Sequence, residues 1–376
     1  MSGKFDIIIG GAAATDLSTT LATLEVEENL DMPGAMEMTL PVKRSADADL
    51  DTVNDPRLAP LANIAITAAA KDGQVHCLFD GYVLSQKLHL DTGTVASTLK
   101  VWGQDASWLM DVQENVREWA DVTDGTVANS IFGQYGFTPD PGNLDDDSPV
   151  HAEKPHSLMQ RGTDAQLLAM LARRGGKLCR VFCTDTPGQR TGWFAAPKLD
   201  GDPVVTLTLN DATAATIDAI DVEWDVMRPS SIAARSAVLS DTDPGGVGGS
   251  TDDSGFTLLG DRGLASFAGR PVAALLTTAV DDAGTLTGRA RAVLRESGWF
   301  VTCRGTADAG RVGSILRAGS IVAIAAAGAL HSGNYLVWSV RHTITSEAHK
   351  MAFRLVRNAV GTPPAGGSLP GAAGSP

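Results

Sequence analysis

The feature that most constrains the fold is a series of short strand-forming runs in the first hundred residues, each bounded by turn-forming residues. The runs lie at Phe5–Ile9, Leu21–Glu27, Ala35–Leu40, Ile64–Ala68, Val75–Phe79 and Thr94–Val101. Gly, Pro, Asn and Asp separate them, as at Asp31–Gly34 and Asn54–Pro56. Strands at this spacing are typical of a β-sandwich or a β-barrel rather than of β-α-β units.

The middle of the chain changes to helical patterns. Asp105–Asp111 is expected to form a short helix, and Thr126–Tyr135 carries apolar residues four apart on one helical face. The strongest helix signal follows, because Thr163 and Gln166 match a capping box and precede a stripe of leucines. Gly175–Gly176 is expected to end that helix.

Strand patterns return after this helix. We expect strands at Leu178–Cys183, Val204–Leu209, Ile220–Val226, Trp299–Cys303, Ile321–Ile324, Tyr335–Ile344 and Met351–Asn358. Residues Pro271–Ser297 are rich in Ala, Leu and Val, and we expect them to be mostly helical. A chain of 376 residues is too long for one hydrophobic core, so two or more domains are expected.

Acidic residues outnumber basic ones, with Asp+Glu 44 against Lys+Arg 30 and a net charge of -14. Such a surface repels phosphate backbones, so stable nucleic-acid binding is not expected. It is suited instead to lining a passage through which an anionic cargo slides. No apolar run is long enough for a membrane helix, and no membrane insertion is expected. Gly10–Gly11 interrupt the apolar start, so a cleaved signal is not expected either.

The four cysteines give no sequence signal for a disulfide. Cys179 and Cys183 fall on one predicted strand about 13 Å apart, which is too far for a bridge. Cys77 and Cys303 stand alone in the sequence. We therefore expect reduced, buried thiols in a protein made in the cytoplasm.

The candidate metal ligands do not converge. His151 and His156 flank Pro155, and His342 and His349 are expected on opposite sides of a hairpin turn, so no zinc site is predicted. A second candidate is the acidic loop of Asp140 and Asp145–Asp147. It offers oxygen ligands for calcium but lacks EF-hand spacing, and a solvated loop is the expected form.

One acidic strand face is the best candidate for catalysis. Asp221, Glu223 and Asp225 alternate with apolar residues and would stand about 7 Å apart, a spacing that fits inverting glycoside hydrolysis. Such alternation is far more often the wet side of a sheet. Trp102 and Trp108 could line a sugar site, but their apolar neighbours favour core positions. We assign no catalytic, cofactor-binding or metal-binding residue and expect no enzyme.

The order of the segments carries more information than any single site. The informative segments are Phe79–Val83, Thr98–Asp105, Trp108–Met110, Gln134–Phe137, His156–Asp164, Leu167–Ala172, Leu316–Gly319, Gly333–Val337, Val340–His342 and Met351–Asn358. In this order and spacing, over residues 5 to 360, the chain resembles the phage late-control D family. Members of that family are baseplate hub proteins of contractile phage tails. Their relatives include the hub part of VgrG spikes in type VI secretion and of extracellular contractile injection systems.

The resemblance implies a mainly β fold with α+β insertions. Residues 1–104 would form a first β-barrel-like hub domain and 105–200 a smaller α/β middle region. Residues 201–360 would form a second β-barrel-like hub domain with a helical insertion and a flexible loop at 241–255. The Gly/Pro-rich tail at 361–376 is expected to be disordered.

The resemblance also implies a function. Three copies would form a ring that joins the hexameric tail tube to a trimeric spike and forms part of the central channel. The expected partners are other copies of the chain, the tube protein, a separate spike protein and other baseplate proteins. The protein would be made in the bacterial cytoplasm and incorporated in the baseplate of a phage virion or injection particle.

Two other functions remain open on the sequence. One is a glycan hydrolase that acts on peptidoglycan through Asp221, Glu223 and Asp225. The other is a surface β-sandwich adhesin.

Overall fold

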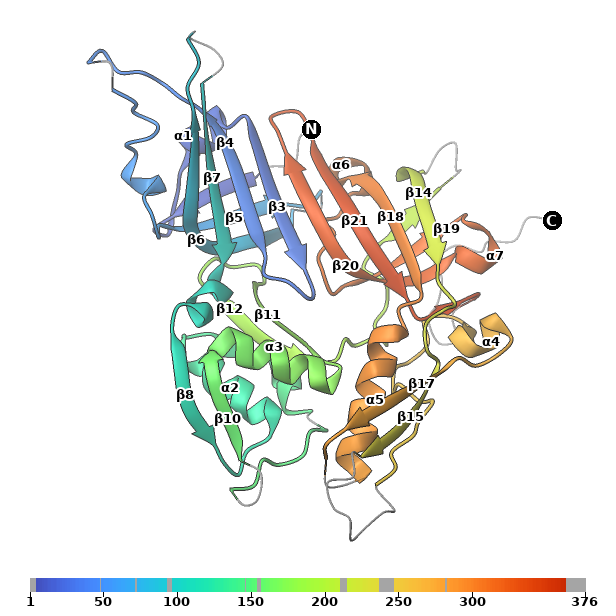
Figure 1. Ribbon diagram of the computed structural model, residues 1–376. Helices are drawn as coiled ribbons and strands as arrows, with labels where there is room; N and C mark the ends of the chain where they lie inside the picture. Colours follow the sequence, from blue (N-terminus) through green and yellow to red (C-terminus); the bar gives the residue numbers. More distant parts are fainter. Residues whose placement is uncertain are drawn as a thin grey trace, which may run out of the picture. The chain divides into compact units, whose positions relative to one another are not determined.

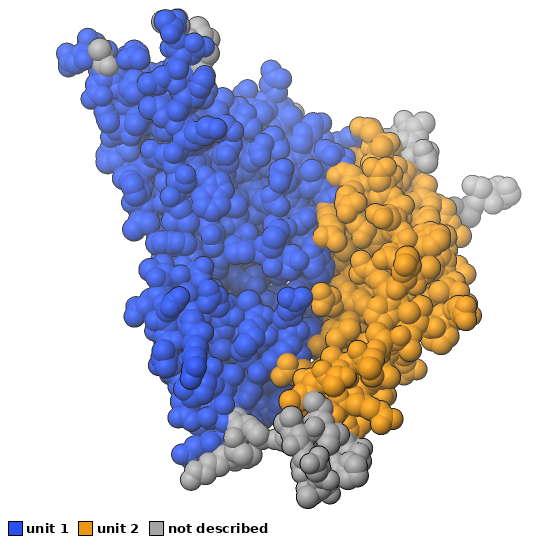
Figure 2. Space-filling model, viewed as in Figure 1, with its two compact units in different colours: residues 1–197, 306–319, 338–353 blue, residues 198–305, 320–337, 354–376 orange. Residues whose placement is uncertain are grey.

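The computed structural model describes residues 5–47, 49–71, 73–92, 97–145, 147–153, 157–209, 215–236, 247–280 and 283–362. Residues 241–246 of the predicted flexible loop at 241–255, and the predicted tail from residue 363 on, lie outside these ranges. The chain forms two compact units (Figure 2). Unit 1 comprises residues 1–197, 306–319 and 338–353, and unit 2 comprises residues 198–305, 320–337 and 354–376. The division at residues 104 and 200 stays a prediction.

The N-terminal part of unit 1 is an antiparallel sheet in the order β3-β4-β7-β6-β5-β1-β2 (Figure 1). Its strands are β1 (Phe5–Ile9), β2 (Ala12–Ala13), β3 (Thr23–Asn29), β4 (Ala35–Pro41), β5 (Asn63–Ala69), β6 (Val75–His89) and β7 (Thr98–Asp105). Two short helices, α1 (Thr15–Thr20) and η1 (Pro56–Leu58), connect them. Strict alternation fixes the register, because Met36, Met38 and Leu40 of β4 are buried while their neighbours are half-exposed.

Strands from the C-terminal part complete this sheet. β18 (Val301–Asp308), β20 (Gly333–Ile344) and β21 (His349–Arg357) each contribute residues to both units, and α6 (Ala309–Val312) follows β18. Within unit 1, β20 pairs antiparallel with β3, with Ile344 opposite Leu24. Segments about 300 residues apart in sequence are therefore neighbours in one sheet.

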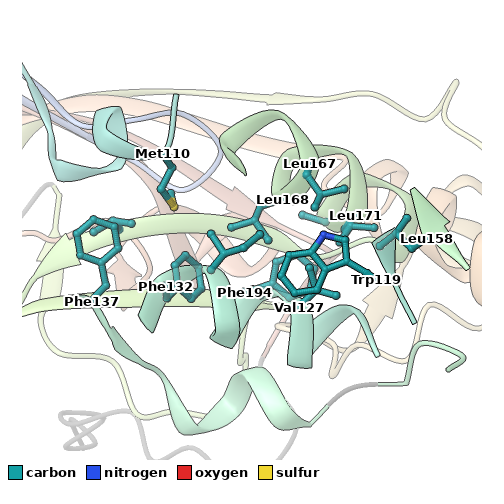
Figure 3. Close-up of a cluster of buried hydrophobic side chains, with 14 of the residues drawn as sticks. Met110, Trp119, Val127, Phe132, Phe137, Leu158, Leu167, Leu168, Leu171 and Phe194 are labelled. Carbon is teal, nitrogen blue, oxygen red and sulfur yellow. The ribbon is translucent and has the colours of Figure 1, made fainter. Parts of the chain in front are cut away.

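An α/β part follows the N-terminal strands in unit 1. Its elements are η2 (Ala106–Asp111), β8 (Glu114–Trp119), α2 (Asp124–Gln134), β9 (Thr138–Pro139), η3 (Pro141–Leu144), β10 (Leu158–Thr163), α3 (Asp164–Gly175), β11 (Leu178–Cys183) and β12 (Arg190–Ala195). α2 and α3 share a core with β11 and β12, in which Phe132, Leu168 and Phe194 are fully buried (Figure 3). The predicted capping box is confirmed, with Thr163 and Gln166 bonded reciprocally at the start of α3.

Unit 2 contains shorter strands, helices and two parallel pairings. Its elements are β13 (Thr206–Thr208), β14 (Ile217–Trp224), β15 (Ser231–Ser236), β16 (Arg262–Gly263), α4 (Leu264–Ala268), β17 (Ala273–Thr278), α5 (Ala283–Ser297), β19 (Ile321–Ala325), α7 (Gly328–His331) and β22 (Ala359–Val360). β15 pairs parallel with β17, and β13 with β19. α5 packs on the β15–β17 pair through Leu286, Ala290 and Leu294.

The expected mainly helical segment Pro271–Ser297 is wrong in its first part. Residues 273–278 form strand β17, and the helix begins only at Ala283. A short apolar run suits either a strand or a buried helix, and here pairing with Ser231–Ser236, about 40 residues earlier, decides it.

The predicted mainly β fold with α+β insertions is confirmed. The sheet of unit 1 runs from β21 to β2 without returning to its first strand in the part that the structure describes. The sheet is therefore open there, and closure into a barrel is not observed.

Gly192 of β12 tests the packing of the α/β core. A Cβ at this position would lie 2.3 Å from the ring of Phe132. Gly192→Ala is therefore expected to lower the free energy of unfolding by about 1–3 kcal/mol. Gly133→Ala is the matched control, because nothing lies within 4 Å of its Cβ position. It should leave the stability unchanged or raise it by up to about 1 kcal/mol. Denaturant unfolding followed by tryptophan fluorescence measures both, and equal effects would refute the packing argument.

Candidate functional site

The best-defined polar site lies in unit 1, where charged side chains from β3, β6, β7, β11 and β12 meet the segment before residue 319. A small cavity at this place is lined by Glu28, Asn29, Gly34, Leu78, Phe79, Asp80, Asp105, Arg180, Val181, Phe182, Cys183, Arg190 and Arg317. Burying several charges in one place is costly unless each is paired and hydrogen-bonded. The contacts of each group therefore decide what the site can do.

Glu28 of β3 is the first buried carboxylate. Arg317 Nε donates a hydrogen bond of 2.6 Å to Glu28 Oε1, and the other guanidinium nitrogens of Arg317 donate to the carbonyls of Cys183 and Thr184. Burial raises the pKa of Glu28. The charge of Arg317, together with that of the nearby His342, lowers it more, so the pKa lies below its usual value. The pair is thus ionised and joins β3 to the end of β11.

Two histidines extend this cluster. His342 Nε2 lies 3.6 Å from Glu28 Oε1, and His342 Nδ1 lies 2.9 Å from His349 Nε2. The rings come from β20 and β21, the two arms of one hairpin, as the sequence predicted, and they face each other across it. Burial, together with the charge of His342, lowers the pKa of His349 to about 3. His349 is therefore neutral at physiological pH.

Asp80 and Asp105 are the other buried carboxylates. Asp80 Oδ1 accepts 2.6 Å from Arg190, whose guanidinium also donates to the Tyr82 hydroxyl. Asp105 accepts from the backbone of Gly34 and from Ser107, without a directly bonded cation. Burial raises the pKa of Asp105 to about 6 despite these hydrogen bonds. Asp105 thus titrates near neutrality while fixing the end of β7.

Arg180 of β11 is the least compensated cation of the site. Its guanidinium donates 3.0 Å to the carbonyl of Ala318 and stacks on the rings of Phe182 and Trp193. Burial lowers the pKa of Arg180 to about 10, so it remains charged. Aromatic stacking of this kind suits a weakly hydrated guanidinium.

The expectation that all cysteines are reduced is wrong for two of them. Cys77 of β6 and Cys183 of β11 form a disulfide, with Cα atoms 5.8 Å apart. The two residues are 106 positions apart, and pairing of Cys77 N with the Thr184 carbonyl brings the strands together. Spacing within one strand excluded a bridge between Cys179 and Cys183, but only the tertiary structure reveals the partner of Cys183. Cys179 and Cys303 are free thiols.

The geometry suits holding elements together better than reacting with a substrate. The cavity measures about 30 Å³, whereas one water needs about 10–15 Å³ by the same measure. Glu28 and Asp80 are each bonded to an arginine, and Asp105 is occupied by three donors. No group of three or more potential metal ligands occurs among the described residues.

The acidic strand face does not build a cleft in the described part of the chain. Asp221 and Glu223 lie on β14 and Asp225 follows it, all exposed. Glu223 lies 3.7 Å from Arg304, and Asp225 lies 3.3 Å from Arg228. The acidic side chains of β14 are exposed to solvent, as predicted.

Neither tryptophan is in the predicted core. Trp108 is half-buried against Tyr82, with ring centroids 5.9 Å apart. Trp102 is 38% exposed and not a core residue, because it alternates with buried Val101 on β7. In a strand, the neighbouring residue points to the opposite face, so the apolar neighbours of Trp102 do not indicate that Trp102 itself is buried.

The acidic loop and the remaining histidines have structural partners. Asp140 accepts from the backbone N–H of Gly142, and Asp147 lies 3.5 Å from Lys177. His151 lies 2.7 Å from Asp124. His156 and Asp146 fall outside the residues that the structure describes.

Of the buried cluster, the sequence had singled out only His342 and His349, as candidate metal ligands that would not converge; the structure brings their rings into contact. Asp80 and Arg317 fall within segments that carry the family resemblance, which was the available signal. Glu28 lies in a run of acids on β3 and resembles its exposed neighbours. Its burial depends on strands that arrive from the other end of the chain.

Comparison with known proteins gives a family match and several similar folds. The model of a family described as the Alg8 N-terminal domain matches residues 2–346. No curated protein matches the sequence. In the described residues, no helix is both long and apolar enough to cross a membrane.

The similar solved structures are tail proteins. The 43 kDa tail protein of prophage MuSo2 from Shewanella oneidensis is 18% identical with a TM-score of 0.65, covering 96% of this chain and 100% of that one. The tail protein from Neisseria meningitidis MC58 is 15% identical with a TM-score of 0.66, covering 95% and 97%.

A third similar structure is the E. coli c3393 protein, a type VI secretion component with structural similarity to T4 tail proteins gp27 and gp5. It is 11% identical with a TM-score of 0.54, covering 97% of this chain and 78% of that one. At such identities the likeness concerns the fold. At that level the predicted resemblance to hub-related proteins of contractile tails and type VI secretion is confirmed.

The disulfide predicts a specific thiol count. Alkylation of the unfolded, unreduced chain should label Cys179 and Cys303 alone, and reduction should expose all 4 cysteines. Replacing Cys77 and Cys183 by serine should lower the free energy of unfolding by about 2–5 kcal/mol. Mass spectrometry gives the count. Four labelled thiols without reductant would contradict the bridge.

The buried histidine predicts acid sensitivity. Because the folded pKa of His349 is about 3 against an ordinary 6.5, the unfolded chain takes up a proton that the folded chain rejects. The free energy of unfolding that His349 contributes above pH 6.5 is therefore lost as the pH falls, by about 2 kcal/mol between pH 7 and pH 5.

His349→Gln should lose about 2 kcal/mol less of its free energy of unfolding than the wild type over that interval. The raised pKa of Asp105 acts in the opposite direction in both proteins and cancels in the comparison. His89→Gln, at an exposed position, should behave as wild type. Parallel curves for the wild type and His349→Gln would exclude this role for His349.

Proposed function

The chain belongs to the family described as the Alg8 N-terminal domain, and we propose that it is a structural hub protein in the baseplate of a contractile tail or contractile injection system. The observation that carries this proposal is the shared fold over nearly the whole length of two tail proteins, one of them from a prophage. The E. coli type VI secretion component with the same fold supports the wider class.

In this proposal the hub joins the hexameric inner tube to a trimeric spike. Three copies form a ring around part of the central channel. The spike is a separate chain, and the remaining partners are the tube protein and other baseplate proteins. The protein is made in the bacterial cytoplasm and incorporated in the baseplate of the virion or injection particle.

The buried cluster supports a mechanical rather than a catalytic role. Arg317 bonds to Glu28 and to two carbonyls at the end of β11, and the disulfide joins the same strand to β6. Removing one partner of a buried ion pair costs about 3–5 kcal/mol, because the other charge is left unpaired. Such contacts resist separation of the sheet from the α/β part when the tail contracts.

The acidic composition supports passage of an anionic cargo. With a net charge of -14, a channel wall formed by this chain repels nucleic acid and acidic proteins, so they pass without adhesion. A channel wall found to be neutral or basic would remove this part of the proposal.

The first test is the mass and the place of the protein. Light scattering of the purified full chain should give three times 39.1 kDa, alone or with the spike. Electron micrographs of particles that carry a labelled chain should place the label between tube and spike. A compact monomer at every concentration, with label absent from the baseplate, would overturn the proposal.

The same preparation separates the hub from a hydrolase. Zymography on peptidoglycan should show no clearing for the wild type or for Glu223→Gln. Clearing by the wild type that vanishes in Glu223→Gln would establish the enzyme instead.

A further inference from the structure

The disulfide of unit 1 lies beside the small cavity between the buried charges. Among the described residues, Cys183 lines that cavity and Cys77 does not. Cys183 is 4% exposed and Cys77 is 0% exposed. A reagent that enters the cavity therefore meets Cys183 before Cys77.

The volume of the cavity limits what can reach Cys183. A space of about 30 Å³ holds about two or three water molecules. Hydrogen peroxide, with two oxygen atoms, fits this space, whereas a disulfide of peptide size such as oxidised glutathione does not. Phe182 and Arg190 of the lining are only half-buried, and Thr184, next to Cys183, is exposed. The cavity thus lies near the surface and admits small molecules only.

The charges around the cavity suit a reaction at Cys183. The thiolate of a cysteine is its nucleophilic form, and a nearby cation stabilises it. Arg317 and Arg190 are each bonded to a carboxylate, whereas Arg180 has none among the described residues and its buried Nε has no hydrogen-bond partner there. Arg180 can therefore stabilise negative charge on the sulfur. Asp105 lines the same cavity and has a pKa of about 6, so it can pass a proton to a leaving hydroxide near neutral pH.

We propose that unit 1 reduces one equivalent of a small peroxide, with Cys183 as the attacking sulfur and Cys77 as the resolving one. The Cys183 thiolate attacks one oxygen of hydrogen peroxide, the O–O bond breaks, and the leaving hydroxide takes a proton and becomes water. Cys183 is then a sulfenic acid. The thiol of Cys77 attacks its sulfur, so the S–S bond forms, the S–O bond breaks and a second water leaves. The two thiols lose two electrons, the peroxide gains them, and the disulfide of the structure is the product.

The product differs from the dithiol in how the parts of unit 1 are joined. The bridge is a covalent bond between β6 and β11, across 106 positions of the sequence. Oxidation therefore strengthens the contact between the N-terminal sheet and the α/β part. This inference goes beyond the proposed hub function and does not depend on it, because the reaction belongs to the single chain.

Oxidation of the folded, reduced full chain tests the size limit. The chain is refolded under reductant, freed of the reductant, and treated with equal concentrations of hydrogen peroxide or of oxidised glutathione. Alkylation and mass spectrometry then count the free thiols over time. Peroxide should form the Cys77–Cys183 bridge about tenfold faster or more, because oxidised glutathione has no access to the folded site. In denaturant, where no cavity exists, oxidised glutathione should also consume both thiols.

Two matched variants test the order of attack. After peroxide treatment and its removal, dimedone is added with denaturant to label any sulfenic acid. In Cys77→Ser no resolving thiol is present, so the sulfenic acid should accumulate and Cys183 should be labelled. In Cys183→Ser, Cys77 should stay unlabelled, because it does not line the cavity in the described part of the chain. The unfolding temperature of each variant shows that it is folded.

The two free thiols are internal controls in every sample. Burial raises the pKa of Cys179 and of Cys303 to about 12, so both stay protonated. Neither should be labelled by dimedone, and neither should be lost during peroxide treatment of the folded chain.

The other outcomes overturn the proposal. A folded dithiol that does not react with peroxide, or that reacts equally fast with oxidised glutathione, contradicts the selective cavity. Labelling of Cys77 in Cys183→Ser as strong as that of Cys183 in Cys77→Ser contradicts the order of attack. A reduced chain that does not fold offers no folded dithiol, and the proposal is then wrong as well. None of these results concerns the mass of the assembly or the place of the chain in a baseplate, so the hub proposal is tested separately.

Discussion

The antiparallel pairing of β20 with β3 is the constraint on which unit 1 depends. It places the end of the chain beside its beginning, with Ile344 opposite Leu24, and so closes a loop of about 300 residues. Closing so long a loop has an entropic cost that rises slowly with length, and the buried contacts around β3 offset it. The Glu28–Arg317 pair and the facing histidines lie at this junction. Burial makes these contacts obligatory, because an unpaired charge there would be strongly destabilising.

Buried and exposed charged side chains have different surroundings in this molecule. The buried carboxylates of unit 1 are engaged by arginines, hydroxyls or backbone N–H groups, and the cavity between them has room for only about two or three water molecules. The acidic excess of the chain is instead on exposed residues such as those of β14. A protein built this way offers other chains a rigid framework and a charged surface.

Unit 2 is organised differently, and its open features are the more informative ones. A two-stranded parallel sheet with one face under α5 and the other exposed is half of a layered structure. Among the described residues, β14 and β17 are each the last strand of their sheet, so one edge of each is unpaired.

The sequence by itself determined what depends on near neighbours. Alternation along β4, the exposed acids of β14 and the capping box of Thr163 and Gln166 follow from periods of two and of about four residues, so these were predictable. The order of such segments was enough to indicate the family. Only the tertiary structure decided that residues 273–278 form a strand, that Cys77 bonds to Cys183, and that Glu28 is buried with Arg317. Each of these depends on a partner between about 40 and 290 residues away, and a local pattern contains no information about such a partner.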